Sequence, residues 1–322
     1  MGESGISLSG ISSAYTRIKD KVHYTPLFRS AQLGGRSGTE LYFKCENLQK
    51  TGSFKVRGVL NKIGKLTEEQ RSRGLVTVSA GNHAQAVAWA AAAMGVACTA
   101  VMPETASRTK IRATEAYGAK VILPGDVYAA FEKTLHLEKD EGLTFVHPFE
   151  DRHLIEGHGT VGLEIMEQLE HVDAVVCGVG SGALSSGIAV AMKEQNPKIR
   201  LYGVEPLGAN AMQQSFEAGE AVTLDQVNTI ADGLAPPMAG GLPFSILRKY
   251  MEEVVTVTDR EIEHAVKELL SWTKLLVEPS GAAATAAILT NKLTFEKGER
   301  VVSVLSGGNM DLDLLSKFIQ NS

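Results

Sequence analysis

The sequence has few cysteines, no cysteine pairs and no excess of positive charge. Among its 322 residues are three cysteines, Cys45, Cys98 and Cys177, without CxxC or Cys/His spacing, so neither a disulfide framework nor a zinc site is expected. We interpret them as buried thiols in a reducing compartment. The formal net charge is −5 and there is no block of lysine or arginine, so no nucleic acid and no anionic membrane is expected as the main partner.

The sequence also lacks a visible secretory leader and an unbroken apolar run of membrane length. Residues 1–13 are rich in glycine and serine and contain neither a basic segment nor an apolar signal core. The run 86–102 is divided by Gly95 and begins with mostly alanine, which predicts a buried helix followed by a strand. With 322 residues, 44% hydrophobic and 21% charged, we expect a globular protein of two lobes with sizeable cores. A cytoplasmic location is expected from the reducing compartment that the cysteines indicate.

Lys55 stands where a predicted strand, 40–45, is followed by a predicted helix, 57–65. Ser53 is a candidate N-cap of that helix, so Lys55 would lie in its first turn, where the helix dipole lowers the pKa of an amine. Ligands of open α/β sheets bind at such corners, and a neutral amine there suits nucleophilic chemistry. Taken alone, however, a Ser-x-Lys segment is far more often part of a solvated surface.

The rest of the chain alternates between short β-rich runs and helical segments. The predicted strands are 75–79, 98–102, 120–123, 144–147, 174–177, 200–205 and 300–305, with helices between them that include 159–169. The polar stretch 148–152 is interpreted as a crossing between lobes, and 222–244 as a loop that shapes a pocket. Thr67 and Thr258 each begin a capping box. This succession predicts mainly parallel sheets with right-handed crossovers.

Glycine-containing turns follow several of these strands. At Gly178-Val179-Gly180-Ser181-Gly182-Ala183, small residues would let backbone N–H groups and a helix dipole surround a phosphate. The turn 79–83 offers N–H groups, a hydroxyl and an amide to a carboxylate, and 306–309 ends another strand. Because all of these turns stand at carboxyl ends of strands, we expect them to meet in one cleft.

Other interpretations of these turns stay open at this point. Gly178-x-Gly180 follows a strand and the next strand ends in Glu205, as in dinucleotide-binding folds. A structural tight turn would also explain the glycines, and a capped turn would explain 79–83. His83 is interpreted as an orienting or packing group, because no second histidine stands at metal-ligand spacing beside it.

Four motifs together resemble the fold type II pyridoxal-phosphate enzymes, specifically the serine/threonine dehydratase and serine racemase group. They are SFKxRG at 53–58, SAGNHAQ at 79–85, EPSGA at 278–282 and SGGN at 306–309, in the family's order over nearly the whole chain. The resemblance implies an α/β fold of two lobes, each a mainly parallel twisted sheet flanked by helices, with the active site between them. It implies a large cofactor-binding domain, 1–70 and 150–322, and a small mobile domain, 71–149.

The resemblance also implies roles for individual residues. Lys55 would form the Schiff base with pyridoxal phosphate and act as the catalytic base, while Ser306 would face the pyridine nitrogen and, being neutral, favour elimination over transamination. Asn82 would contact the ring oxygen, and Glu278 would act near the ring, with a buried structural carboxylate as the alternative. Further cofactor contacts are expected from Phe54, Gly180, Ser181, Gly182, Ala183 and Leu184. Substrate contacts are expected from Ser79, Ala80, Gly81, Asn82, His83 and Gly233.

The sequence departs from the family pattern in three places. Ser181 and Ala183 interrupt a phosphate loop that is usually a run of glycines. Racemase members carry a serine where this chain has Ala80, which cannot carry a proton, so little racemase activity is expected. Some relatives bind a divalent cation through a glutamate and an aspartate six residues later. Here Glu205 is followed by Ala211 at that position, so we expect no metal.

The resemblance implies β-elimination of water from a small β-hydroxy L-amino acid, giving a 2-oxo acid and ammonia, by a cytoplasmic homodimer. L-Threonine and L-serine are the expected substrates. The apolar segment 236–238 keeps L-threo-3-phenylserine as an alternative, and the loop around it, 231–241, contains no cation for a second carboxylate. More distant alternatives are a serine racemase and a nicotinamide-dependent dehydrogenase.

Overall fold

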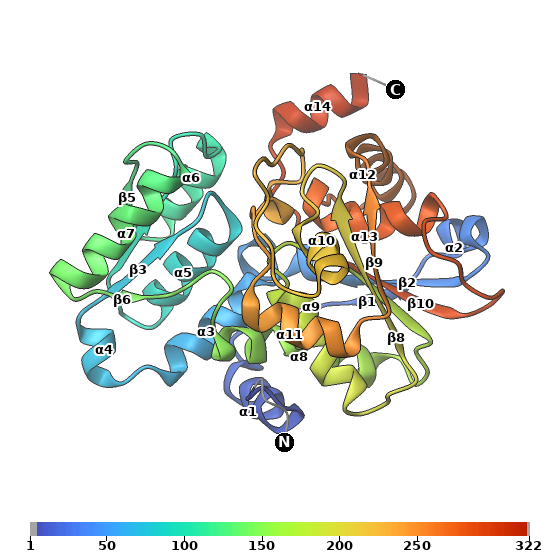
Figure 1. Ribbon diagram of the computed structural model, residues 1–322, viewed down its shortest axis with the longest axis horizontal. Coiled ribbons are helices and arrows are strands. Elements are labelled where there is room, and N and C mark those ends of the chain that lie inside the picture. The colour runs from blue at the N-terminus through green and yellow to red at the C-terminus, as the bar shows by residue number, and fades with distance from the viewer. Residues whose placement is uncertain (1–4, 321–322) are drawn as a thin grey trace.

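The computed structural model describes residues 5–320. Within this range the strands form a six-stranded sheet, in the order β1-β2-β10-β7-β8-β9, and a four-stranded sheet, in the order β5-β4-β3-β6. The two sheets belong to separate lobes, with the four-stranded lobe on the left of Figure 1. The sequence-based prediction of two mainly parallel sheets flanked by helices is confirmed.

The large sheet carries the strands that lead into the lysine corner and two of the glycine turns. Its strands are β1 (Leu27–Arg29), β2 (Glu40–Cys45), β7 (Ala174–Gly178), β8 (Arg200–Pro206), β9 (Glu253–Val257) and β10 (Arg300–Leu305). Only β1 runs antiparallel to its neighbour, and Val301 of β10 pairs with Leu41 on one side and Ala174 on the other. The apolar residues of β7 and β10 are buried, as expected for parallel strands covered on both faces.

The small sheet is parallel throughout. It contains β3 (Leu75–Val78), β4 (Cys98–Val101), β5 (Lys120–Ile122) and β6 (Thr144–Phe145), flanked by α5 (Asn82–Ala93), α6 (Arg108–Ala116) and α7 (Val127–Glu141). The chain enters this lobe after α4 (Glu68–Ser72), which begins with the predicted capping box at Thr67. It returns to the large lobe before Arg152, so within residues 5–320 two segments join the lobes.

The remaining helices and short 3-10 turns belong to the large lobe. They are α1 (Leu8–Ile18), η1 (Glu46–Leu48), η2 (Lys50–Gly52), α2 (Ala31–Ser37), α3 (Lys55–Lys65), α8 (Arg152–Gln168), α9 (Ala183–Lys193), α10 (Ala211–Ala218), η3 (Asp232–Leu234), α11 (Gly241–Tyr250), α12 (Asp259–Thr273), α13 (Pro279–Leu289) and α14 (Leu312–Gln320). Helix α8 lies close to α3. An added Cβ at Gly157 would come within 2.6 Å of the Arg57 carbonyl oxygen, so only a glycine fits there without a shift. This close approach fixes the helix that carries Lys55.

Some predicted boundaries are wrong. Helix α8 begins at Arg152 rather than 159, because the Asp151 carboxylate accepts hydrogen bonds from the backbone N–H groups of His153 (2.8 Å) and Leu154 (3.1 Å). The segment expected as a loop, 222–244, contains η3 and the start of α11. Helices α2 and α14 and strand β9 were not predicted.

The prediction of buried thiols is confirmed, because Cys45, Cys98 and Cys177 are all free and buried. Burial raises the pKa of each thiol to about 12, which keeps it protonated. Within residues 5–320, no helix combines the length and the apolar character that crossing a bilayer requires.

Candidate active site

The lysine corner and the turn after β10 contact each other directly. Ser53 and Gly307 form an isolated antiparallel bridge, and the Phe54 backbone N–H donates to the Ser306 carbonyl oxygen at 3.1 Å. Lys55 follows as the first residue of α3. Two predicted parts of the site, more than 250 residues apart in the sequence, are therefore brought together.

The predicted N-cap at Ser53 is wrong. Ser53 has extended backbone angles (φ −161°, ψ 161°), as its bridge to Gly307 requires, and Phe54 occupies the N-cap position without a side-chain cap. The Ser53 hydroxyl is buried and has no hydrogen-bond partner among the described residues. It is thus available to a ligand rather than used by the helix.

Lys55 is partly buried beside aromatic and backbone groups. Its Nζ donates to the Pro148 carbonyl oxygen at 3.3 Å and lies 5.1 Å from the centre of the Phe54 ring. Within residues 5–320 no carboxylate forms an ion pair with it. Burial lowers the pKa of Lys55 to about 8, so the predicted direction is right, although desolvation is the cause rather than the helix dipole.

The turn 79–83 connects β3 to α5 and faces the large lobe. The Asn82 Nδ2 donates to Glu278 Oε1 at 2.6 Å, and Asn82 Oδ1 accepts from Asn309 Nδ2 at 2.9 Å. The Ser79 hydroxyl accepts from the Gly81 N–H at 3.1 Å, whereas Ala80 is exposed and contributes only a methyl group. Both partners of Asn82 follow from predicted motifs, 278–282 and 306–309.

His83 is a buried neutral imidazole. Its Nε2 lies 3.2 Å from the Val146 carbonyl oxygen, and its Nδ1 has no partner among the described residues. Burial, together with the nearby charge of Lys55, lowers the pKa of His83 to about 3. An imidazole held neutral does not add positive charge to the site, and the orienting or packing role of His83 stays a prediction.

Glu278 is a buried carboxylate at the N-cap of α13. Burial raises its pKa to about 7, and Lys110 opposes this rise with Nζ at 3.9 Å from Glu278 Oε2. Lys110 itself forms an ion pair with Asp232. Sequence analysis missed Lys110, because it is one of 32 lysines and arginines and no motif distinguishes it.

The glycine loop after β7 leads into the N-terminus of α9. Gly182 is the N-cap and has φ +97°, a left-handed conformation that suits glycine. Ala183 and Leu184 are buried in the first turn of α9, so the alanine methyl is accommodated. Free N–H groups at this helix end can bind a phosphate.

The loop 231–241 packs against that glycine loop. The Ser181 carbonyl oxygen accepts from the Gly240 N–H at 3.1 Å, and an added Cβ at Gly180 would lie 3.3 Å from the Gly233 carbonyl oxygen. The Gly233 N–H donates to Ser280 Oγ at 2.8 Å, next to Glu278. Contacts thus connect all predicted segments of the site.

Glu205 does not fit a cation site or a ribose site. Its two carboxylate oxygens accept from the backbone N–H groups of Met212 (2.9 Å) and Gln213 (2.8 Å) at the start of α10. Burial raises its pKa to about 8. In the described part of the chain, no three His, Cys, Asp or Glu side chains are grouped as metal ligands.

A buried ion network that sequence analysis also missed lies behind Lys55. Arg57 donates through Nε to Glu46 Oε2 at 2.7 Å and through Nη1 to Glu164 Oε1 at 2.6 Å. Lys44 Nζ donates to the second oxygen of Glu164 at 2.6 Å. The network ties the first turn of α3 to η1, β2 and α8.

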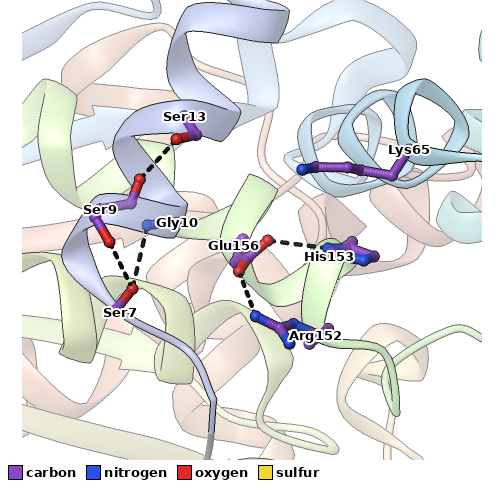
Figure 2. Close-up of a pocket in the computed structure, with 8 residues that line it drawn as sticks. All are labelled: Ser7, Ser9, Gly10, Ser13, Lys65, Arg152, His153 and Glu156. Atoms are coloured by element: carbon purple, nitrogen blue, oxygen red, sulfur yellow. Dashed lines mark hydrogen bonds and ion pairs between the residues drawn. The ribbon is translucent and has the colours of Figure 1, made fainter. Parts of the chain in front are cut away.

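A separate cavity of about 280 Å³ lies between α1, the end of α3 and the start of α8 (Figure 2). Three of its lining side chains contact one another, since Glu156 accepts from Arg152 at 3.5 Å and lies 3.1 Å from His153 Nδ1. None of the residues predicted for the active site lines this cavity.

Comparison with known proteins identifies the family. A family model described as pyridoxal-phosphate dependent enzyme matches residues 18–307. The chain is 45% identical over 315 residues to an L-threonine ammonia-lyase of Thermotoga maritima. The aligned region covers 98% of this chain and 78% of that protein. Among solved structures, maize serine racemase matches with a TM-score of 0.93 at 36% identity, covering 98% of this chain and 97% of the other. The processed form of threonine deaminase isoform 2 from Solanum lycopersicum matches with a TM-score of 0.91 at 35% identity, covering 97% and 92%.

The residues present fit the cofactor that this family binds. Lys55 offers an amine of lowered pKa without a carboxylate partner, and the Gly180 to Gly182 loop offers a phosphate the free N–H groups of a helix end. The buried Ser53 hydroxyl without a partner adds a polar atom for a ligand beside Lys55. The chain belongs to the pyridoxal-phosphate dependent enzymes, with the fold type II architecture expected from its sequence.

Proposed function

We propose that this protein is a pyridoxal-phosphate-dependent ammonia-lyase that removes water from a β-hydroxy L-amino acid and yields a 2-oxo acid and ammonia. L-Threonine and L-serine are the proposed substrates. The similarity to L-threonine ammonia-lyase and to threonine deaminase supports this assignment. The structural observation that carries it is Lys55, an amine with its pKa lowered to about 8. Its neighbour Phe54 bonds to Ser306, and its charge acts on His83 of the turn 79–83.

Lys55 serves two tasks in this proposal. It would hold the cofactor covalently until the substrate amino group displaces it, and its freed neutral amine would then accept the Cα proton of the substrate on one face. The bound cofactor supplies the electron sink for the pair of electrons left on Cα. Cleavage of the bond between Cβ and oxygen releases the hydroxyl, which takes up a proton and leaves as water. Hydrolysis of the released enamine then gives the 2-oxo acid and ammonia.

The other residues bind and orient. The turn 79–83 is proposed to receive the substrate carboxylate, supported by its position at the N-terminus of α5, where N–H groups and the helix dipole favour an anion. Ser306 is proposed to face the ring nitrogen, Asn82 the ring oxygen, and Gly180 to Leu184 the phosphate. Phe54 and Gly233 complete the proposed contacts, to the cofactor and the substrate respectively.

The domain division, the location and the assembly are also proposals. A large domain, 1–70 and 150–322, and a small mobile domain, 71–149, are supported by the two sheets and by the two segments that join them. A cytoplasmic location is supported by three free cysteines, which suit a reducing compartment. A homodimer is proposed from the family resemblance.

An absorbance spectrum followed by a 2-oxo acid assay tests the function. We expect a purified protein with a visible absorbance band of bound cofactor, and release of 2-oxo acid from L-threonine and L-serine. Activity on L-threo-3-phenylserine would indicate that the apolar segment 236–238 admits an aryl group. A spectrum without that band, or no 2-oxo acid from any of the three amino acids, would contradict the proposal.

Serine racemase activity is the second candidate, favoured by the match to maize serine racemase. Racemisation needs a proton donor on the face opposite Lys55, and Ala80 offers only a methyl group at the position that carries a serine in the racemases. We therefore expect little D-serine from the wild-type enzyme and a measurable increase in the Ala80→Ser variant, followed by chiral chromatography. Fast racemisation by the wild-type enzyme would overturn this assignment.

A further inference from the structure

Lys110 reaches from the small lobe into the candidate active site. It belongs to α6, is only 6% exposed, and forms an ion pair with Asp232 of η3 in the large lobe. The aliphatic part of its side chain lies against the turn of residues 79–83, as the distance of 2.9 Å from Lys110 Cδ to an added Cβ at Gly81 shows. The ammonium group is therefore a cation beside the turn proposed to bind the substrate carboxylate.

Glu278 is the second carboxylate within reach of this ammonium group. Its Oε1 accepts from Asn82 Nδ2 at 2.6 Å, while its Oε2 has no hydrogen bond to any described residue and lies 3.9 Å from Lys110 Nζ. The charged groups that act on it are Lys110 of α6 and Asp232 of η3, and Asp311 acts in turn on Lys110. Burial is the main cause that raises the pKa of Glu278 to about 7. Lys110 acts to lower this pKa, and Asp232 acts to raise it.

We propose that Lys110 is a positioning residue of the active site that keeps Glu278 ionised against the amide of Asn82, and that Asp232 limits this effect by sharing the same ammonium group. An ionised carboxylate accepts the Asn82 N–H more strongly than a neutral one does. The Asn82 oxygen then stays turned toward Asn309, which fixes the residue that the proposed function places against the cofactor ring. The inference rests on that proposed function.

The arrangement also couples the two lobes. Lys110 stands on the small lobe, whereas Asp232 and Glu278 stand on the large lobe, so the charge of Lys110 reaches Glu278 only while the lobes are together. Separation of the lobes would leave Glu278 without its cation and favour its uptake of a proton near neutral pH. Asn82, which also stands on the small lobe, would part from Glu278 in the same movement.

The test compares variants of the two partners in the ion pair, Lys110→Met and Asp232→Asn, in the purified full-length protein. The titration of Glu278 is followed by NMR with carbon-13 in the glutamate carboxylates, its signal being identified by its loss in Glu278→Gln. We expect the pKa of Glu278 to rise by about one pH unit in Lys110→Met, and to fall in Asp232→Asn, where the ammonium group is released toward Glu278.

A second measurement follows the acidic limb of the pH profile of kcat/KM. We expect it to move to higher pH in Lys110→Met, to return in Lys110→Arg, and to move to lower pH in Asp232→Asn. The matched control is Arg73→Met, which removes a positive charge and the 2.8 Å ion pair with Glu69, since neither group acts on Glu278. Its acidic limb should stay in place.

Opposite shifts from the two members of one ion pair distinguish this proposal from a structural role. A purely structural ion pair would make both variants change in the same direction, or leave the titration of Glu278 unmoved, and either result would overturn the proposal. Asp232 has a half-exposed side chain, so its variant tests the proposal even if Lys110→Met does not fold. Failure of the wild-type protein to release ammonia would instead contradict the proposed function, and the NMR titration would still report on Lys110.

Discussion

The amine of Lys55 lowers the stability of the fold at neutral pH when no cofactor is bound. Burial lowers its pKa from an ordinary value of 10.5 to about 8, so the folded state disfavours the ammonium form relative to the unfolded chain. The resulting cost at pH 7 is on the order of 3 kcal/mol. A site that needs a neutral nucleophile thus accepts a less stable fold around it.

We predict that Lys55→Met is more stable than the wild type at pH 7, when both lack cofactor, by about 2–3 kcal/mol. Between pH 8 and 10.5 the unfolded wild type holds a proton that the folded form has lost, so the stability of the wild type rises with pH. The difference in free energy of unfolding between Lys55→Met and the wild type should therefore become smaller over this range, as measured by urea unfolding. A difference that stays constant from pH 7 to 10.5 would contradict the lowered pKa.

Single residues were predicted well where a motif surrounds them and poorly where only tertiary contacts define them. The place of Lys55 in the first turn of a helix was predicted because it stands between a strand and a helix in a recognisable motif. Ser53 was misread as an N-cap because its bridge to Gly307 is formed across the fold. Lys110 meets Asp232 across 122 positions of sequence, and no local pattern signals such a pair.

At the scale of elements, the placement of α3 depends on a buried ion network. Arg57 donates to Glu46 of η1 and to Glu164 of α8, and these side chains are completely or almost completely buried. Removing one partner leaves uncompensated charge in the interior, which is costly. The network therefore determines where the first turn of α3, and with it Lys55, can lie.

We expect Arg57→Met to lower the free energy of unfolding by about 3–5 kcal/mol, as measured by urea denaturation. The matched control is Arg36→Met, which breaks an ion pair between Arg36 and Glu268 whose arginine side chain is 44% exposed. Its cost should stay below about 1 kcal/mol. Equal losses in the two variants would show that the buried network does not hold α3.

Glycines allow α3 and α8 to approach each other. An added Cβ at Gly58 would lie 2.6 Å from the Leu154 carbonyl oxygen and also overlap the His158 ring, so α8 would have to shift. We predict that Gly58→Ala destabilises the protein by roughly 1–3 kcal/mol and weakens cofactor binding, measured by thermal unfolding and absorbance titration.

The control for this prediction is Gly35→Ala in α2, where an added Cβ meets nothing within 4 Å. The loss of glycine flexibility should make this variant more stable by about 0.5–1 kcal/mol. Destabilisation of both variants to the same extent would exclude close helix packing as the cause.

At the scale of the whole molecule, the alternation of strands and helices could be predicted from the sequence because both sheets are built from β-rich runs separated by helical segments. Two helices were missed because they contain glycine or proline, which are typical of loops. Helix α2 contains Gly34 and Gly35, and α11 begins at Gly241 with Pro243 in its first turn, so both resemble loops. The sequence did not predict that Lys110 comes from the small lobe or that it pairs with Asp232 of the large lobe, because this contact forms only in the folded protein.

The central claim is that strand ends from both lobes converge on one lysine that holds the cofactor. It is tested most directly by reducing the protein with sodium borohydride while the cofactor is bound, and by locating the fixed cofactor through peptide mass spectrometry. We predict a single modified site, Lys55. Modification of another lysine, such as the buried Lys44 or Lys110, or no modification at all, would contradict the account.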